Sequence, residues 1–238
     1  MVDDLFNKIE ARPEAEVTAA EKAVLKARYM SRKGEVGSSL ATLEKLRSDD
    51  PTNVSYWLEW STLDLANRKP VEILDVIATA PESVRKSPVM LIAQANLWTY
   101  VGGDAGKSGL IKLLESAPAD RPEERMQLQL LVGQSLTRLG DIAGAKAVAA
   151  TALAQTLETK PREMRPFRLQ ADIAVQTGDL DMLENTLTEM RKFVSQDDDY
   201  YRYARSQYLV LKVRTAGAQE NSVRRHAAWC STRPKPGI

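Results

Sequence analysis

The segment Gly106-Lys107-Ser108 is the first place where residue types suggest chemistry. A glycine, a lysine and a hydroxyl in this order are typical of loops that cradle phosphate with backbone amides and an ammonium group. Such a loop also needs a glycine five residues before Gly106, where this chain has Val101, and a preceding strand. The residues before Val101 close a helical pattern instead. We therefore expect a turn and a helix start here, and no nucleotide site.

Metal or nucleophile chemistry would depend on His226 and Cys230, the single histidine and the single cysteine. They lie four residues apart and could share a helix face, but they leave a zinc ion short of ligands. Asp197, Asp198 and Asp199 lack the ligand spacing of a calcium loop, so we expect them to cap the next helix. With no catalytic constellation left, we expect no enzyme, no cofactor and no bound metal.

Aromatic residues gather in two places. Trp57 and Trp60, next to Tyr56, are three residues apart and share one helix face, so we expect them to pack between helices. The alternative is that Tyr56 or Trp60 is exposed as an anchor for a partner. The segment 200–205 mixes tyrosine with arginine, as single-strand nucleic-acid surfaces do, but most of the chain is acidic and we do not expect nucleic acid.

The net charge of +1 is unevenly distributed. Residues 202–238 carry a net charge of +7, and the remainder carries −6. We expect a solvated basic end, with contact to an anionic partner as the alternative. The start of the chain has no apolar run, and no apolar window of about 18 residues occurs anywhere. We therefore expect no secretory signal, no membrane span and a cytoplasmic location.

Turn signals recur along the chain and predict the helices between them. They are centred on residues 34, 68, 102, 140, 178 and 217, first 34 residues apart and later 38 or 39. Glycine adopts the left-handed conformation that ends a helix, and an aspartate at 104, 141 or 179 can cap the next one. The many Leu, Ala, Glu, Arg and Lys residues favour helix. The predicted pairs are 17–32 with 36–47, 54–67 with 70–79, 87–101 with 105–116, 122–139 with 142–157, 163–177 with 180–195, and 200–216 with 219–229.

These units resemble tetratricopeptide repeats, whose pattern places a small residue seven positions before the turn and a large apolar residue eleven before it. The large position holds Trp57, Leu91 and Phe167 in three units. The resemblance covers 17–216 and implies an all-α fold, a right-handed α-solenoid of about six antiparallel helix-turn-helix repeats. Residues 1–16 would be an N-terminal extension, and 217–238 a degenerate basic end. Another α-solenoid family is the alternative. The small position holds Ala27, Ser61, Ala95, Gly133 and Ala171, with Val210 as a departure in the sixth unit.

The resemblance also implies function, because first helices in that family line a concave face that grips a peptide or helix. Guanidinium groups pair well with carboxylates, so we expect a scaffold or adaptor whose groove takes an extended or acidic segment of a partner protein. Alternatives are ordinary solvated arginines, a regulatory or assembly module of a larger secretion, transcription or enzyme system, and a homo-oligomer formed through the uncapped C-terminal end. The residues expected on this face are Arg28, Arg32, Thr62, Asn96, Tyr100, Gln134, Arg138, Arg165, Arg168, Asp172 and Arg214.

Overall fold

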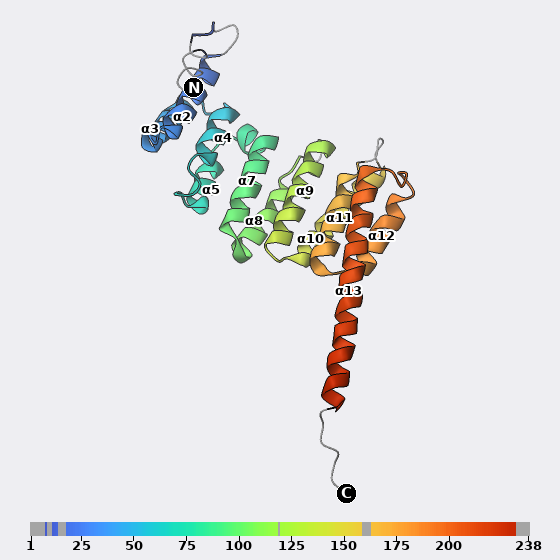
Figure 1. Cartoon of the computed structure of the whole chain (residues 1–238). Helices are drawn as coiled ribbons and strands as arrows, with labels where there is room; N and C mark the ends of the chain where they lie inside the picture. Colours follow the sequence, from blue (N-terminus) through green and yellow to red (C-terminus); the bar gives the residue numbers. More distant parts are fainter. Residues whose placement is uncertain (1–7, 9–10, 14–17, 119, 159–162, 232–238) are drawn as a thin grey trace. The chain divides into compact units, whose positions relative to one another are not determined.

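The computed structural model describes residues 8, 11–13, 18–118, 120–158 and 163–231, with side chains except at Glu158 and 218–231. This described part is entirely helical, with twelve helices and no strand (Figure 1). The chain divides into two compact units, Met1–Leu139 and Gly140–Ile238. Most of the predicted extension 1–16, and the side chains of His226 and Cys230, lie outside the described residues.

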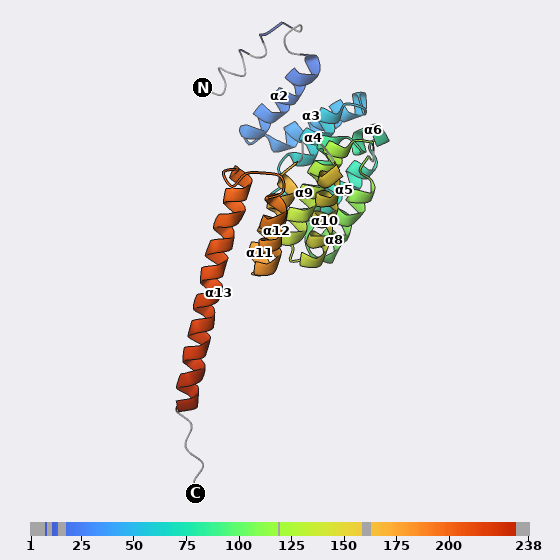
Figure 2. The same ribbon diagram turned by 90° about the vertical axis from the view of Figure 1, so that its right-hand side faces the viewer.

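The first unit is a succession of packed helices. Helix α2 packs against α3 (Figure 2), and α7 packs against α8 and also contacts α4, α5 and α9, beside which it is labelled in Figure 1. Helix α7 therefore lies between α4 and α9, which come before and after it in sequence. The bounds are α2 (Ala19–Arg32), α3 (Val36–Asp49), α4 (Val54–Thr62), α5 (Pro70–Ala78), α6 (Glu82–Arg85), α7 (Pro88–Val101), α8 (Gly103–Glu115) and α9 (Pro122–Arg138).

Local chemistry sets most of these boundaries. Thr18 and Glu21 form a reciprocal capping box at the start of α2. Gly34 and Gly102 have positive φ values of 87° and 67°, as predicted for the residues that end α2 and α7. Asp104 was expected to cap α8, but this prediction is wrong, because α8 already begins at Gly103 and Asp104 instead forms an ion pair with Lys107.

The core of the first unit depends on small residues where helices cross. Ala27, Ser61 and Ala95, which hold the predicted small position of three units, are each fully buried. Ser39 of α3 donates a hydrogen bond from Oγ to the carbonyl of Ala27 at 2.6 Å. In the third pair, a Cβ at Gly109 would overlap the indole ring of Trp98. Close helix packing therefore accounts for these small residues.

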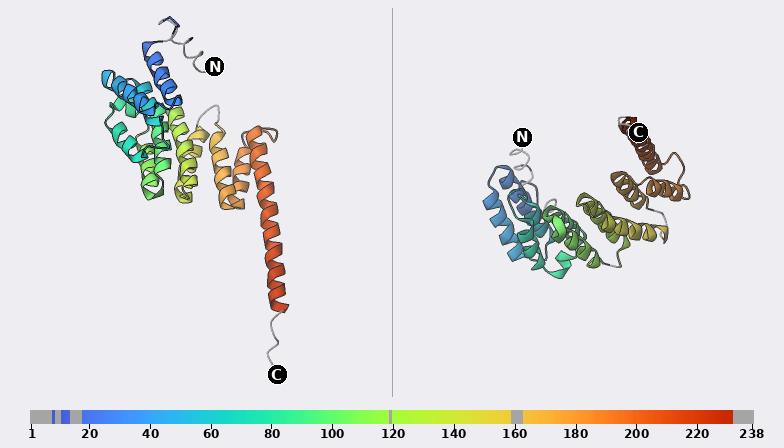
Figure 3. Two further views of the ribbon diagram at one scale, coloured as in Figure 1. Left: turned by 60° about the vertical axis from the view of Figure 1, so that its left-hand side comes forward. Right: turned by 90° about the horizontal axis from the view of Figure 1, so that it is seen from below.

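The second unit contains α10 (Ile142–Glu158), α11 (Arg165–Thr177), α12 (Leu180–Met190) and α13 (Asp199–Ser231). Helix α11 packs against the other three, and α12 also packs against α13. Phe167, Leu183 and Tyr201 lie at the centre of its core. Helix α13 continues well past the ends of α11 and α12 (Figure 3).

Two predicted boundaries are wrong for identifiable reasons. The turn expected at 216–218 is absent, and α13 runs through it as one helix of 33 residues. Gly217 has alanines on both sides and no following capping residue, and a single glycine costs a helix only about 1 kcal/mol. Helix α4 ends at Thr62 rather than at 67, because Arg68 folds back and donates from Nη1 to the carbonyls of Trp60 and Leu63.

Candidate functional site

Four of the residues predicted to contact a partner line one cavity of the first unit, which we call the groove. They are Thr62 from α4, Asn96 and Tyr100 from α7, and Arg138 from α9. The groove encloses about 400 Å³, and Ser61, Leu65, Ala93, Leu97 and Thr99 complete its lining. Helix α7 contacts both α4 and α9, which is why residues distant in sequence meet here.

The groove combines an apolar floor with polar groups at its rim. Ala93 and Leu97 are buried, whereas Asn96 and Tyr100 lie four residues apart on an exposed face of α7. The Tyr100 side chain is 68% exposed, which is unusual for a large aromatic residue. An apolar surface with an exposed tyrosine beside it suits contact with another polypeptide.

Only some of the polar groups are available to a ligand. The hydroxyl of Thr62 donates to the carbonyl of Leu58 at 2.9 Å, and the hydroxyl of Thr99 donates to the carbonyl of Ala95 at 2.8 Å. Within the described part of the chain, the side chains of Asn96, Tyr100 and Arg138 have no hydrogen-bond or ion-pair partner. These three groups are therefore the ones that can recognise a ligand.

Arg138 gives the groove its charge. It is the single ionisable cation among the residues that line the cavity, and no carboxylate lines it. The residue lies in the last turn of α9, where the helix dipole also favours a cation. An exposed guanidinium without an internal partner can form a two-pronged pair with an incoming carboxylate.

Three other predicted residues of the first unit lie outside this lining. Arg28 donates to both carboxylate oxygens of Glu59, with 2.7 Å from Nε to Oε2, and this contact raises the pKa of the Arg28 guanidinium. Its charge is therefore already compensated. Arg32 and Gln134 are exposed, in the last turn of α2 and one turn before Arg138, and neither lines the groove.

The predicted residues of the second unit are mostly engaged in internal contacts. The hydroxyl of Tyr203 donates to Oδ1 of Asp172 at 2.6 Å, and this bond, together with burial, raises the pKa of Tyr203. The Arg168 guanidinium lies 5.0 Å from the centre of the same ring. Arg165 is paired with Glu163 at 2.7 Å, and that contact lowers the pKa of Glu163. Arg214 is exposed on α13.

The aromatic patch of α4 belongs to the core. Tyr56, Trp57 and Trp60 are each at most 6% exposed, so an exposed anchor at Tyr56 or Trp60 is excluded. The guanidinium of Arg47 lies 4.4 Å from the ring centre of Trp57 and 4.0 Å from that of Trp60, and Arg68 lies 4.2 Å from Trp60. Burial lowers the pKa of both arginines. These cations stabilise the aromatic layer by stacking.

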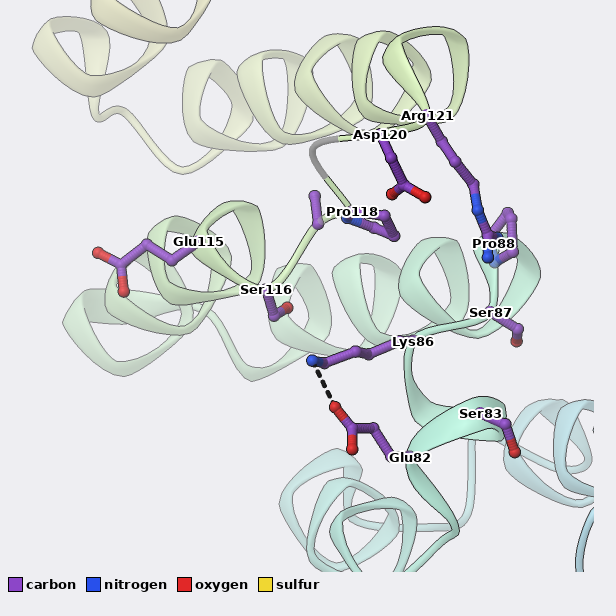
Figure 4. A pocket seen from close by; sticks show the side chains of 11 residues that line it. Glu82, Ser83, Lys86, Ser87, Pro88, Glu115, Ser116, Pro118, Asp120 and Arg121 are labelled. Carbon is purple, nitrogen blue, oxygen red and sulfur yellow. Dashed lines mark ion pairs between the residues drawn. The ribbon is translucent and has the colours of Figure 1, made fainter.

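A second hollow, of about 560 Å³, lies where α6 meets the start of α7 and the end of α8 meets the start of α9 (Figure 4). No motif in the sequence predicts this hollow. Its two cations are already paired, Lys86 with Glu82 at 2.6 Å and Arg121 with Glu124 at 3.2 Å. Because Glu115 and Asp120 add uncompensated negative charge, this hollow is less suited than the groove to an acidic ligand.

Two further observations concern chemistry and membranes. Gly106 and Lys107 lie inside α8, with Gly106 against the carbonyl of Trp98, so they form no phosphate-binding loop. In the ranges that the structure describes, no three His, Cys, Asp or Glu side chains are grouped to hold a metal ion. No helix in those ranges is long and apolar enough to cross a membrane.

Comparisons of the chain with protein-family models, with curated proteins and with solved structures found no match.

Proposed function

We propose that this chain is a tetratricopeptide-like α-solenoid that binds a segment of another protein and acts as an adaptor or scaffold. Support for the repeat comes from the small position of each unit. Gly133 and Ala171 are buried, as are the equivalent residues of the three earlier units. In this proposal α13 takes the place of the first helix of a sixth unit. Its small position holds Val210, which departs from the repeat pattern and is 47% exposed.

The groove is the observation that carries the proposed function. It brings the unpaired guanidinium of Arg138, the amide of Asn96 and the exposed phenol of Tyr100 to one apolar floor. An extended peptide presents backbone amides and carbonyls to such a rim and alternate side chains to the floor. The proposed ligand is therefore an extended segment with an apolar residue for the floor and a carboxylate for Arg138.

Peptide display against the full chain tests this proposal. We expect the selected peptides to share an Asp or Glu next to an apolar residue. Arg138→Glu should weaken their binding about tenfold or more, because a repulsive contact replaces an attractive ion pair. Tyr100→Ala should also weaken binding, because truncating an exposed aromatic contact removes buried area.

Lys45→Glu is the matched control, because Lys45 is exposed on α3 and does not line the groove. All variants should retain the circular dichroism spectrum of the wild type. If Arg138→Glu binds the selected peptides as well as Lys45→Glu does, the groove is not the binding site.

A further inference from the structure

Helix α13 has one packed face and one uncovered apolar face. Tyr201, Ala204 and Leu211 are buried against α11 and α12. The side chains of Leu209, Val210 and Val213 lie on another face of α13 and are 52%, 47% and 73% exposed. We call these three residues the outer stripe. Leu209 and Val213 are one helical turn apart and share a face with Val210 beside them, so the three side chains form one apolar patch on the helix.

The outer stripe is surrounded by positive charge. Arg205 lies one turn before Leu209, and Arg214 one turn after Val210, while Arg202 lies nearer the start of the helix. Residues 200–217 contain no acidic residue. The guanidinium groups of Arg202, Arg205 and Arg214 are exposed and have no ion-pair partner among the described residues. The surface thus presents aliphatic side chains between uncompensated cations.

We infer that the outer stripe is a second docking surface, separate from the groove, and that it takes an acidic amphipathic helix of a partner protein. We expect the partner segment to be a helix, because α13 already packs against α11 as one helix against another. The outer stripe is a second apolar surface on the same helix. The charge of the expected partner follows from four exposed bases in the part of α13 whose side chains are described, Arg202, Arg205, Lys212 and Arg214. Carboxylates on both sides of an apolar ridge would pair with them as the ridge covers the stripe.

Two other occupants fit the surface less well. A second copy of α13 would bring the same cations into contact, and like charges at an interface disfavour association. An anionic membrane would be attracted by the same cations, so the decision between it and an acidic helix depends on the apolar residues. Membrane-surface helices use a wide apolar face with large aromatic residues, whereas the stripe has three aliphatic side chains.

Photo-crosslinking in the cells that make the protein identifies the occupant. The full chain carries p-benzoylphenylalanine in place of Val213, and a control chain carries it in place of Val71, which is 48% exposed on α5. We expect the Val213 probe to crosslink to a protein segment whose apolar residues recur every three or four positions with Asp and Glu beside them. Crosslinks to a second copy or to lipid, or none beyond those of the control, would overturn the inference.

A designed peptide tests the chemistry directly. The probe is a helical peptide of about 20 residues, long enough to be stable when stapled, with a leucine ridge flanked by glutamates. Fluorescence anisotropy should show binding to the full chain that weakens about tenfold with Val213→Glu, since one buried aliphatic contact is lost and a like charge is added. A peptide with lysines in place of the glutamates should not bind.

Two matched variants separate this surface from general effects and from the groove. Val71→Glu adds the same charge at a similarly exposed valine, and Arg138→Glu changes the groove; both should bind the probe like the wild type. Thermal unfolding should show that Val213→Glu remains folded, because Val213 is 73% exposed. Equal binding by Val213→Glu and wild type, or loss of binding in Arg138→Glu, would refute a separate site on α13.

Discussion

At the scale of single residues, Asp179 links a helix cap to an ion pair. Its Oδ1 accepts from the amide of Met182 at 2.9 Å, and Nζ of Lys146 donates to its Oδ2 at 2.9 Å. The contact with Lys146, followed by the bond from Met182, lowers the pKa of Asp179. One carboxylate therefore both starts α12 and ties it to α10.

Changing Asp179 should alter how stability depends on pH. Because its pKa is lower in the folded chain, its contribution is complete above the ordinary Asp pKa of about 4 and is lost as the pH falls through the folded-state pKa. Asp179→Ala should cost about 1 kcal/mol at neutral pH through loss of the cap. Asp179→Asn can keep the cap but should lose this part of the acid dependence.

Urea unfolding across the acid range measures both effects. Asp181→Asn is the control, because Asp181 is an exposed carboxylate in the first turn of the same helix. If Asp179→Asn and wild type differ in stability by the same amount at neutral and at strongly acidic pH, the titration of Asp179 does not contribute.

Residue types predicted the small crossing positions well, because a crossing point leaves room only for a small side chain. The buried Ala27 and Ala171 illustrate this. The same spacing argument could not tell which arginines are free. Arg28 and Arg138 were both expected on the same binding face, yet Glu59 from another helix neutralises Arg28 and no carboxylate lies beside Arg138 in the groove. Such pairing depends on tertiary contacts that the pattern of one helix does not contain.

At the scale of elements, glycine followed by aspartate predicted a helix end correctly at Gly178, whereas the lone glycine at 217 did not end a helix. Gly178 is left-handed and Asp179 then caps α12, so two local signals agree. Gly217 has no such companion, and α13 continues. The early end of α4 could not be foreseen, because it is set by a side chain, Arg68, that returns from the following loop.

The continuity of α13 can be tested with Gly217→Pro. Proline removes a backbone donor and clashes with the preceding turn, so it should open the helix around residue 217 at a cost of about 3 kcal/mol. Amide hydrogen exchange over 212–225 should accelerate strongly, and Gly217→Ala should slow it. Among the side chains of α13 that the structure describes, the buried ones end with Leu211, before the substitution, so protection of α11 and α12 should not change. Unchanged exchange in Gly217→Pro would indicate a turn at this position.

At the scale of the whole molecule, each of the two units contains an apolar core cluster of its own, and further buried residues such as Leu110 and Leu136 belong to neither cluster. One runs from Ala27 to Leu97 and the other from Met164 to Leu211. In a repeat architecture each element depends mainly on its immediate neighbours. Damage to one core should therefore remain confined to the unit that contains it.

Phe167→Ala tests this confinement. Phe167 is fully buried, and its removal should cost about 3–5 kcal/mol by leaving a cavity. Hydrogen exchange should accelerate across α11 and α12 while α4 and α5 keep wild-type protection. Thr188→Ala, at an exposed site of α12, is the control and should change little. Equal loss of protection in α4 would show that the two cores unfold together.

The local character of the first core has a consequence for how the chain is made. All its residues come from one continuous stretch, so every contact in it is available once Leu97 and the helix around it have left the ribosome. Domains fold as they emerge, and contacts between residues close in sequence form quickly. The first core can thus be complete before Phe167 is synthesised, and the growing chain never has to hold the apolar residues of both cores exposed at once.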